Sequence, residues 1–128
     1  MYYQMGLTVP PQTPESEAVI ERIPLTRGSI RSIMVAFPPG CCALCHVQVF
    51  DKGWQLVPWT PGESLAWDDY VFDLLQNYPL VAEPYELTVK AWNDDESYPH
   101  NIFVGVLMEE GEVDTSFMEF MRALKEAA

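Results

Sequence analysis

Residues 42–46 read Cys-Ala-Leu-Cys-His, which is the spacing by which c-type haem is attached to protein chains. In such a site Cys42 and Cys45 would form thioether bonds to the haem, and His46 would bind its iron. Haem attachment motifs are usually followed by a helix, whereas the residues after His46 alternate between polar and apolar types as in a strand. A c-type haem protein is therefore one alternative, and a strand with small, partly buried thiols is the simpler interpretation.

His100 is the only other histidine, in a segment that reads Asn-Asp-Asp-Glu-Ser-Tyr-Pro-His-Asn. The segment resembles the part of blue copper proteins that carries their first histidine ligand. A copper site of that class also needs a cysteine and a second histidine farther along the chain, and neither follows His100. The cysteines near His46 likewise lack a second ligand pair at zinc-like spacing. We predict no metal site, and expect His100 to hydrogen-bond the loop that contains Asp94 and Asp95.

Carboxylates cluster at Asp68 with Asp69 and again at residues 94–96. Oxygen ligands of this kind suit Ca²⁺, but no Asp-x-Asp-x-Asp-Gly loop is present, so solvated acidic loops are the favoured interpretation. We find no glycine-rich phosphate loop and no Ser/His/Asp arrangement in a chain with two histidines. The sequence therefore predicts a protein that is not an enzyme and that holds no cofactor.

Three tryptophans, Trp54, Trp59 and Trp67, fall within fourteen residues. Indole rings in a loop can stack on sugars, which makes a carbohydrate-binding β-sandwich module a second alternative. Tryptophan is also favoured in cores and at subunit contacts, and we weigh that interpretation more heavily.

The elements that position these residues are predicted to be strands. Residues 86–91 alternate in polarity, residues 93–97 form a turn, and residues 102–108 resume a strand that is apolar on both faces. Phe103 and Leu107 form its second apolar face, which requires a cover: another sheet, a helix or a neighbouring subunit. Further strands are predicted at 2–9, 18–24, 29–37, 41–50 and 54–57, and residues 70–75 fit either a short strand or a helical turn.

A C-terminal helix is expected after Asp114, which can cap its first turn. Phe117, Met121 and Leu124 then fall on one apolar stripe. We predict an all-β fold, a two-sheet β-sandwich of about seven or eight strands with jelly-roll or immunoglobulin-like connections. The domain covers residues 1–112 with an N-terminal strand or arm, and residues 113–128 form the short amphipathic helix.

Composition excludes several classes of function. The 128 residues include 7 Lys and Arg against 19 Asp and Glu, a net charge of −12. Such acidity argues against direct binding to nucleic acid or to an anionic membrane. No secretory signal opens the sequence and no apolar run reaches the ~18 residues of a membrane span. The clustered Cys41, Cys42 and Cys45 cannot form a disulfide framework, which favours a reducing compartment.

Three stretches taken together carry a resemblance: residues 23–50, residues 54–69 and residues 83–107. The first shared feature is a turn glycine before a strand, and the second is a Phe-Pro-Pro-Gly-Cys corner. The third is a Pro-Tyr-Glu-Leu strand that is followed by an Asn-Asp loop and by Tyr-Pro-His. In these features the chain resembles small β-sandwich virion structural proteins of tailed phages and related metagenomic viruses. The resemblance implies a capsid-surface, decoration or head-completion role without enzymatic activity, and it carries over no functional residue. Cys45 departs from the pattern, because an apolar residue would ordinarily occupy that strand position.

We therefore predict a structural or assembly protein, located in the virion after synthesis in the host cytoplasm. Its expected partners are itself, as a homodimer or homotrimer, and other virion or assembly proteins. The residues expected to make these contacts lie in the N-terminal arm, the second strand of the hairpin and the terminal helix: Tyr2, Tyr3, Phe103, Leu107, Phe117, Met121 and Leu124.

Overall fold

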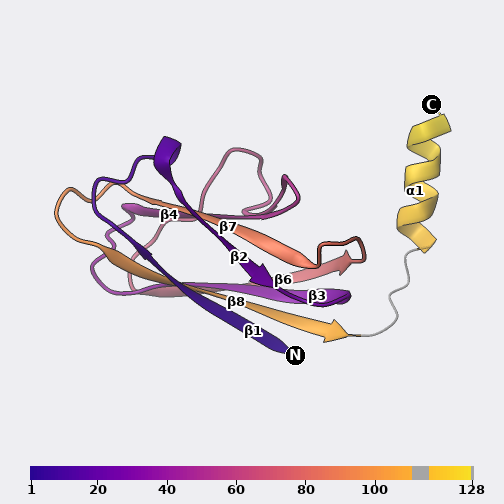
Figure 1. The fold of residues 1–128 in the computed structure, drawn as a ribbon, viewed down its shortest axis with the longest axis horizontal. Coiled ribbons are helices and arrows are strands. Elements are labelled where there is room, and N and C mark those ends of the chain that lie inside the picture. The colour runs from indigo at the N-terminus through magenta and orange to yellow at the C-terminus, as the bar shows by residue number, and fades with distance from the viewer. Residues whose placement is uncertain (111–115, 128) are drawn as a thin grey trace.

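The protein is described by a computed structural model that covers residues 1–110 and 116–127. Figure 1 shows two layers of strands with one helix apart from them at the C-terminal end. The elements are β1 (Tyr2–Val9), the 3-10 turn η1 (Glu15–Glu17), β2 (Val19–Pro24), β3 (Gly28–Phe37), β4 (Cys45–Asp51), β5 (Trp54–Val57), β6 (Tyr70–Leu80), β7 (Glu86–Asn93), β8 (His100–Glu110) and α1 (Ser116–Ala127).

The strands pair like one long hairpin that has been rolled up. Strand β4 pairs with β5, β3 with β6, β2 with β7 and β1 with β8, all antiparallel. The resulting sheets have the orders β1-β8-β3-β6 and β2-β7-β4-β5. An immunoglobulin-like sandwich keeps its first two strands in one sheet, whereas β1 and β2 lie here in different sheets. The predicted two-sheet β-sandwich is confirmed, and its strand order is that of a jelly roll.

The core lies between the two sheets and is built from every second residue of each strand. The side chains of Ile102, Val104, Val106 and Met108 on β8 are buried, as the alternation predicted. Facing strands of the other sheet contribute a second row of buried side chains that includes Leu87, Val89, Ala91, Val47 and Val49.

Two local predictions need correction or completion. Strand β4 begins at Cys45 rather than at Cys41, because Cys42 and Ala43 have φ angles of 49° and 59° that a strand does not tolerate. Residues 70–75 prove to be strand, and β6 continues to Leu80. Val71 and Leu75 are exposed on one side of this strand, whereas Phe72 and Leu74 pack against the core on the other, so apolar residues on both faces obscured the alternation.

The predicted terminal helix is present as α1, and it stands apart from both sheets in Figure 1. Phe120, Met121 and Leu124 on α1 are 59%, 49% and 52% exposed. The predicted cap Asp114, the side chain of Phe117 and the predicted boundary at residues 112–113 lie outside the described residues. Within the described part of the chain, no helix has the length and apolarity needed to cross a membrane.

Candidate functional site

The sheet β1-β8-β3-β6 has an apolar surface on the side that faces away from the core. Its strands place Tyr2 opposite Leu107, Leu107 opposite Ser32, and Ser32 opposite Leu75. Phe103 and Leu107 are 53% and 42% exposed, so the second apolar face predicted for β8 is open in the single chain. We call the following six side chains the outer apolar face: Tyr2, Met34, Val71, Leu75, Phe103 and Leu107.

Two aromatic rings of the outer apolar face lie against glycines of the neighbouring strand. A side chain at Gly105 would collide with the hydroxyl of Tyr2, and a Cβ at Gly6 would lie 3.2 Å from the ring of Phe103. Tyr3 packs instead against the core side of the sheet. Its hydroxyl donates a 3.0 Å hydrogen bond to Glu110 Oε1, and this bond raises the pKa of Tyr3.

Of the residues predicted to make protein contacts, the structure therefore brings Tyr2, Phe103 and Leu107 onto one surface. Tyr3 lies on the other side of β1, where its phenol packs against the core. Met121 and Leu124 lie on the separate helix α1.

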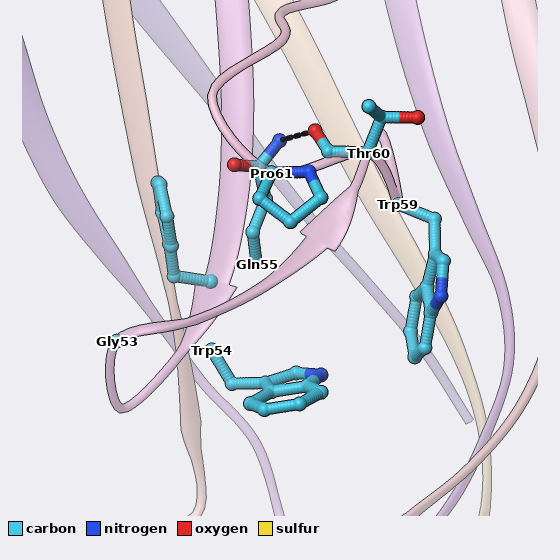
Figure 2. Close-up of a pocket in the computed structure, with 7 residues that line it drawn as sticks. Gly53, Trp54, Gln55, Trp59, Thr60 and Pro61 are labelled. Carbon is cyan, nitrogen blue, oxygen red and sulfur yellow. Dashed lines mark hydrogen bonds between the residues drawn. The ribbon is translucent and has the colours of Figure 1, made fainter.

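A cleft lies beside the β4–β5 hairpin and is shown in Figure 2. Trp54 and Trp59 meet there edge to face, with ring centroids 6.4 Å apart and planes at 69°. The two rings form the walls of a corner with a volume of about 530 Å³. Phe50, Gln55, Thr60 and Pro61 complete most of the lining.

Gln55 on β5 holds the loop that carries Trp59. Its Nε2 lies within hydrogen-bond distance of three loop carbonyl oxygens, at 2.8 Å from Pro58, 3.2 Å from Thr60 and 2.9 Å from Glu63. Its Oε1 accepts a 3.0 Å bond from the amide of Gly62. Gln48 adds a 2.8 Å bond from its Nε2 to the Glu63 carbonyl. The sequence pattern did not single out either glutamine, because both read only as polar positions of strands.

Trp59 also lines a second depression of about 650 Å³. It lies between the loop and β6 and is lined by Trp59, Leu65, Asp73 and Leu75 among others. Trp67, the third tryptophan of the predicted ligand loop, lines neither space. Its side chain is 56% exposed, and its carbonyl accepts a hydrogen bond from Ala43. Only two of the three tryptophans are therefore brought together.

The expectation that the chain has no Ser/His/Asp arrangement is wrong. His46 Nδ1 lies 2.8 Å from Ser64 Oγ, and His46 Nε2 lies 3.0 Å from Asp94 Oδ2. The imidazole also stacks on Trp92, with centroids 5.0 Å apart and planes at 7°. The sequence could not show this because Ser64 and Asp94 lie in two loops that only the fold brings to His46.

A serine nucleophile needs oxyanion donors and a substrate cavity beside it; of the described clefts, the two beside Trp59 are lined by other residues. The contacts among Ser64, His46 and Asp94 link the two loops that begin at residues 58 and 94. That the protein is not an enzyme stays a prediction.

The second histidine behaves as predicted, since His100 Nε2 lies 2.9 Å from Asp95 Oδ2. Asp95 Oδ1 also accepts the backbone amides of Ser97 and Tyr98, at 2.9 and 3.3 Å. The bond from Ser97 and the one from His100 hold the pKa of Asp95 below its ordinary value. The acidic loop is thus organised by its own hydrogen bonds. Among the described residues, no group of three or more His, Cys, Asp or Glu side chains is arranged to hold a metal ion.

The Cys-x-x-Cys-His residues do not share one surface. Cys42 is exposed in a turn, whereas Cys45 is fully buried between the sheets. Burial raises the pKa of Cys45 to about 12, and both ring nitrogens of His46 have protein partners. A thioether at Cys45 would have to form inside the core, so we do not propose haem attachment.

Neither a protein-family model nor a curated protein matches this chain. The resemblance to virion proteins therefore stays a prediction.

Proposed function

We propose that this protein is a non-enzymatic structural protein that acts through protein–protein contacts, as a capsid-surface or decoration component of a virus particle. The observation that supports it is the outer apolar face. Monomeric soluble proteins rarely expose large contiguous apolar patches, and larger ones mark interaction sites. A virion role is favoured by the resemblance in residues 23–107, and the jelly roll is compatible with it, since viral capsid proteins use this architecture among others.

The charge of the molecule fits contact through this face. The chain carries a net charge of −12, which makes two copies repel at most orientations. None of the six side chains of the outer apolar face is charged, and Asp73 stands at the β6 edge opposite Met34. Contact between two copies through these six side chains would bring uncharged groups together, apart from Asp73, which lies between Val71 and Leu75 on the same side of β6.

Helix α1 is the second surface that calls for a partner. Phe120, Met121 and Leu124 are about half exposed. Residues 116–127 contain two acidic residues, Glu119 and Glu126, and two basic ones, Arg122 and Lys125, so the segment has no net charge. A neutral amphipathic helix can lie on the outer apolar face of another copy, as helices pack into apolar grooves. A closed homodimer or homotrimer would bury both surfaces.

Light scattering coupled to gel filtration tests the assembly. The full chain is expected to run as an oligomer, and Leu107→Glu to shift it to a single chain because a carboxylate would be buried in the contact. Ile20→Glu is the matched control, since Ile20 is 60% exposed but lies on β2 in the other sheet. A single chain at every concentration, unchanged when residues 113–128 are removed, would contradict assembly.

The virion role needs its own measurement. Mass spectrometry of purified particles of the virus that encodes the chain is expected to find the protein at a fixed ratio to the major capsid protein. Treatment of intact particles with an amine-reactive reagent should label Lys52, which lies in the exposed β4–β5 turn. Absence of the protein from purified particles would contradict the virion role and leave assembly as a separate result.

A further inference from the structure

The cleft between Trp54 and Trp59 has the size and lining of a ligand site. Its volume of about 530 Å³ falls within the range of about 300–1,000 Å³ that small-molecule sites occupy. Such sites are lined mainly by apolar and aromatic groups with few polar ones. Here Trp54, Trp59, Phe50 and Pro61 supply the apolar walls.

The two indole rings are arranged to receive a ligand rather than to cover each other. Trp54 and Trp59 are 62% and 61% exposed, although a buried indole would stabilise the fold far more. Their planes meet at 69°, and Figure 2 shows that the two rings stand at an angle to each other and are not stacked. A flat ligand can pack on the face of one indole ring, and the other ring then restricts the lateral position of the ligand.

The site is already formed without a ligand. The loop that carries Trp59 is tied to β5 by the amide of Gln55, whose bond to the Thr60 carbonyl is drawn in Figure 2. Backbone bonds in both directions between Val47 and Leu65 fix the far end of the same loop. Because the rings are held in place, little conformational entropy is lost when a ligand binds.

We propose that this cleft binds a neutral sugar, with the C–H face of a pyranose ring packed on one indole and bounded by the other. The negative face of an indole attracts the weakly positive C–H groups of a pyranose. The lining residues carry no charge, and the net charge of −12 repels anionic ligands, so a neutral glycan fits best.

Trp59 also lines the second depression, which extends the site beyond one sugar ring. Asp73 lies in that depression, and its carboxylate can accept hydrogen bonds from sugar hydroxyls. A disaccharide that crosses Trp59 would therefore reach both spaces. We expect a disaccharide to bind more tightly than its monosaccharide, and Asp73→Asn to reduce that difference.

The inference goes beyond the proposed assembly role and does not depend on it. The cleft between Trp54 and Trp59 is built from the β4–β5 hairpin and the loop after it, whereas the outer apolar face belongs to the sheet β1-β8-β3-β6. The second depression does reach that face, because Leu75 lines it. Loss of sugar binding through Trp54→Ala would therefore leave the oligomeric state unchanged, and a monomeric variant such as Leu107→Glu would still bind sugar in the cleft.

The test is an NMR titration of the indole N–H signals of the full chain with glucose, cellobiose and lactose at millimolar concentrations. Saturable shifts of the Trp54 and Trp59 signals are expected, with cellobiose or lactose binding more tightly than glucose. Trp54→Ala and Trp59→Ala should each weaken binding by about tenfold or more. Trp67→Ala is the matched control and should leave binding unchanged, because Trp67 is equally exposed but lies outside the cleft.

Three other outcomes would contradict the proposal. No saturable shift with any of the three sugars would exclude the assigned ligand class. Shifts that persist in both Trp54→Ala and Trp59→Ala would place the sugar elsewhere. Tighter binding of a proline-rich peptide would reassign the cleft to peptide recognition. Unchanged thermal midpoints of the variants, expected for such exposed side chains, show that a loss of binding is not a loss of folding.

Discussion

The hydroxyl of Tyr2 lies over the Cα of Gly105, in the space that a side chain at position 105 would occupy. Tyr2 belongs to the edge strand β1 and Gly105 to β8, so the N-terminal residues cover the only glycine of β8. The contact explains why β8 carries a residue without a side chain between Phe103 and Leu107. It also couples the position of the N-terminal strand to the outer apolar face.

Substitutions at two glycines should differ in cost. Gly105→Ala would push the end of the Tyr2 side chain aside, and we expect a loss of about 1 kcal/mol in the free energy of unfolding. Gly28→Ala would place its Cβ 2.5 Å from the backbone carbonyl oxygen of Glu109. Because backbone cannot move as a side chain does, its cost should be about 2–3 kcal/mol. Urea denaturation measures both.

The Gly105 prediction has an internal control. In a Tyr2→Ala background the obstructing ring is absent, so Gly105→Ala should cost less than in the native chain. Equal costs in the two backgrounds would show that the contact between Tyr2 and Gly105 does not exist in solution.

Because of Asp95, the free energy of unfolding should decrease as the solution becomes acidic. Its pKa is lowered by hydrogen bonds from Ser97 and His100, so its contribution is present above the ordinary aspartate pKa of about 3.9. That contribution is lost as the pH falls through the lower pKa of the folded protein. Asp95→Asn should therefore be less stable than the native chain at neutral pH, and the difference should shrink as the solution is acidified.

Urea midpoints measured between about pH 7 and pH 2 check the Asp95 prediction. Glu83→Gln is the matched control, because Glu83 is exposed in the turn before β7. A pH dependence of Asp95→Asn identical to that of the native chain would show that Asp95 is not the group responsible.

Gln55→Ala should loosen the loop that carries Trp59. The substitution leaves the Gly62 amide and three loop carbonyls without their shared partner. A loss of about 1–3 kcal/mol is expected, together with faster hydrogen exchange at Gly62. Gln4→Ala, an exposed glutamine on β1, should change neither quantity. Unchanged exchange at Gly62 in Gln55→Ala would mean that the loop is held by other contacts.

The three thiols should differ in reactivity. Cys42 is exposed, whereas Cys41 and Cys45 are buried, and burial raises their pKa values to about 11 and about 12. A thiol reagent at neutral pH should react rapidly with one cysteine of the folded chain and with the other two only after denaturant is added. Cys42→Ala should remove the rapid phase, and a second rapid thiol in that variant would contradict the burial of Cys41 and Cys45.

Much of the fold could be predicted from the pattern of polar and apolar residues. The alternation in residues 86–91 and 102–108 predicted the strands β7 and β8 and identified Ile102, Val104, Val106 and Met108 as core. Alternation works here because each strand of a two-sheet sandwich has one face toward the core. It failed for residues 41–44, where positive φ angles at Cys42 and Ala43 form a turn that residue types alone did not indicate.

The candidate sites were less predictable, because they depend on which loops meet. The sequence singled out Trp54, Trp59 and Trp67 as a group, but the fold brings only the first two together. The sequence pattern did not indicate a role for Gln55. It also did not indicate the contacts of His46 with Ser64 and Asp94, because these residues are 18 to 48 positions apart in the chain. Side-chain hydrogen bonds between distant loops leave no periodic pattern.

The sequence by itself determined the class of fold, the acidic surface and the existence of apolar side chains on both faces of β8. Only the tertiary structure decided that Leu107, Ser32 and Leu75 form one row and that Tyr2 lies over Gly105. It also decided that Phe103 is left 53% exposed. The physical reason is that alternation specifies which side of a strand is apolar. Which strands lie next to each other, and therefore which side chains make one surface, follows from the pairing of the whole rolled hairpin.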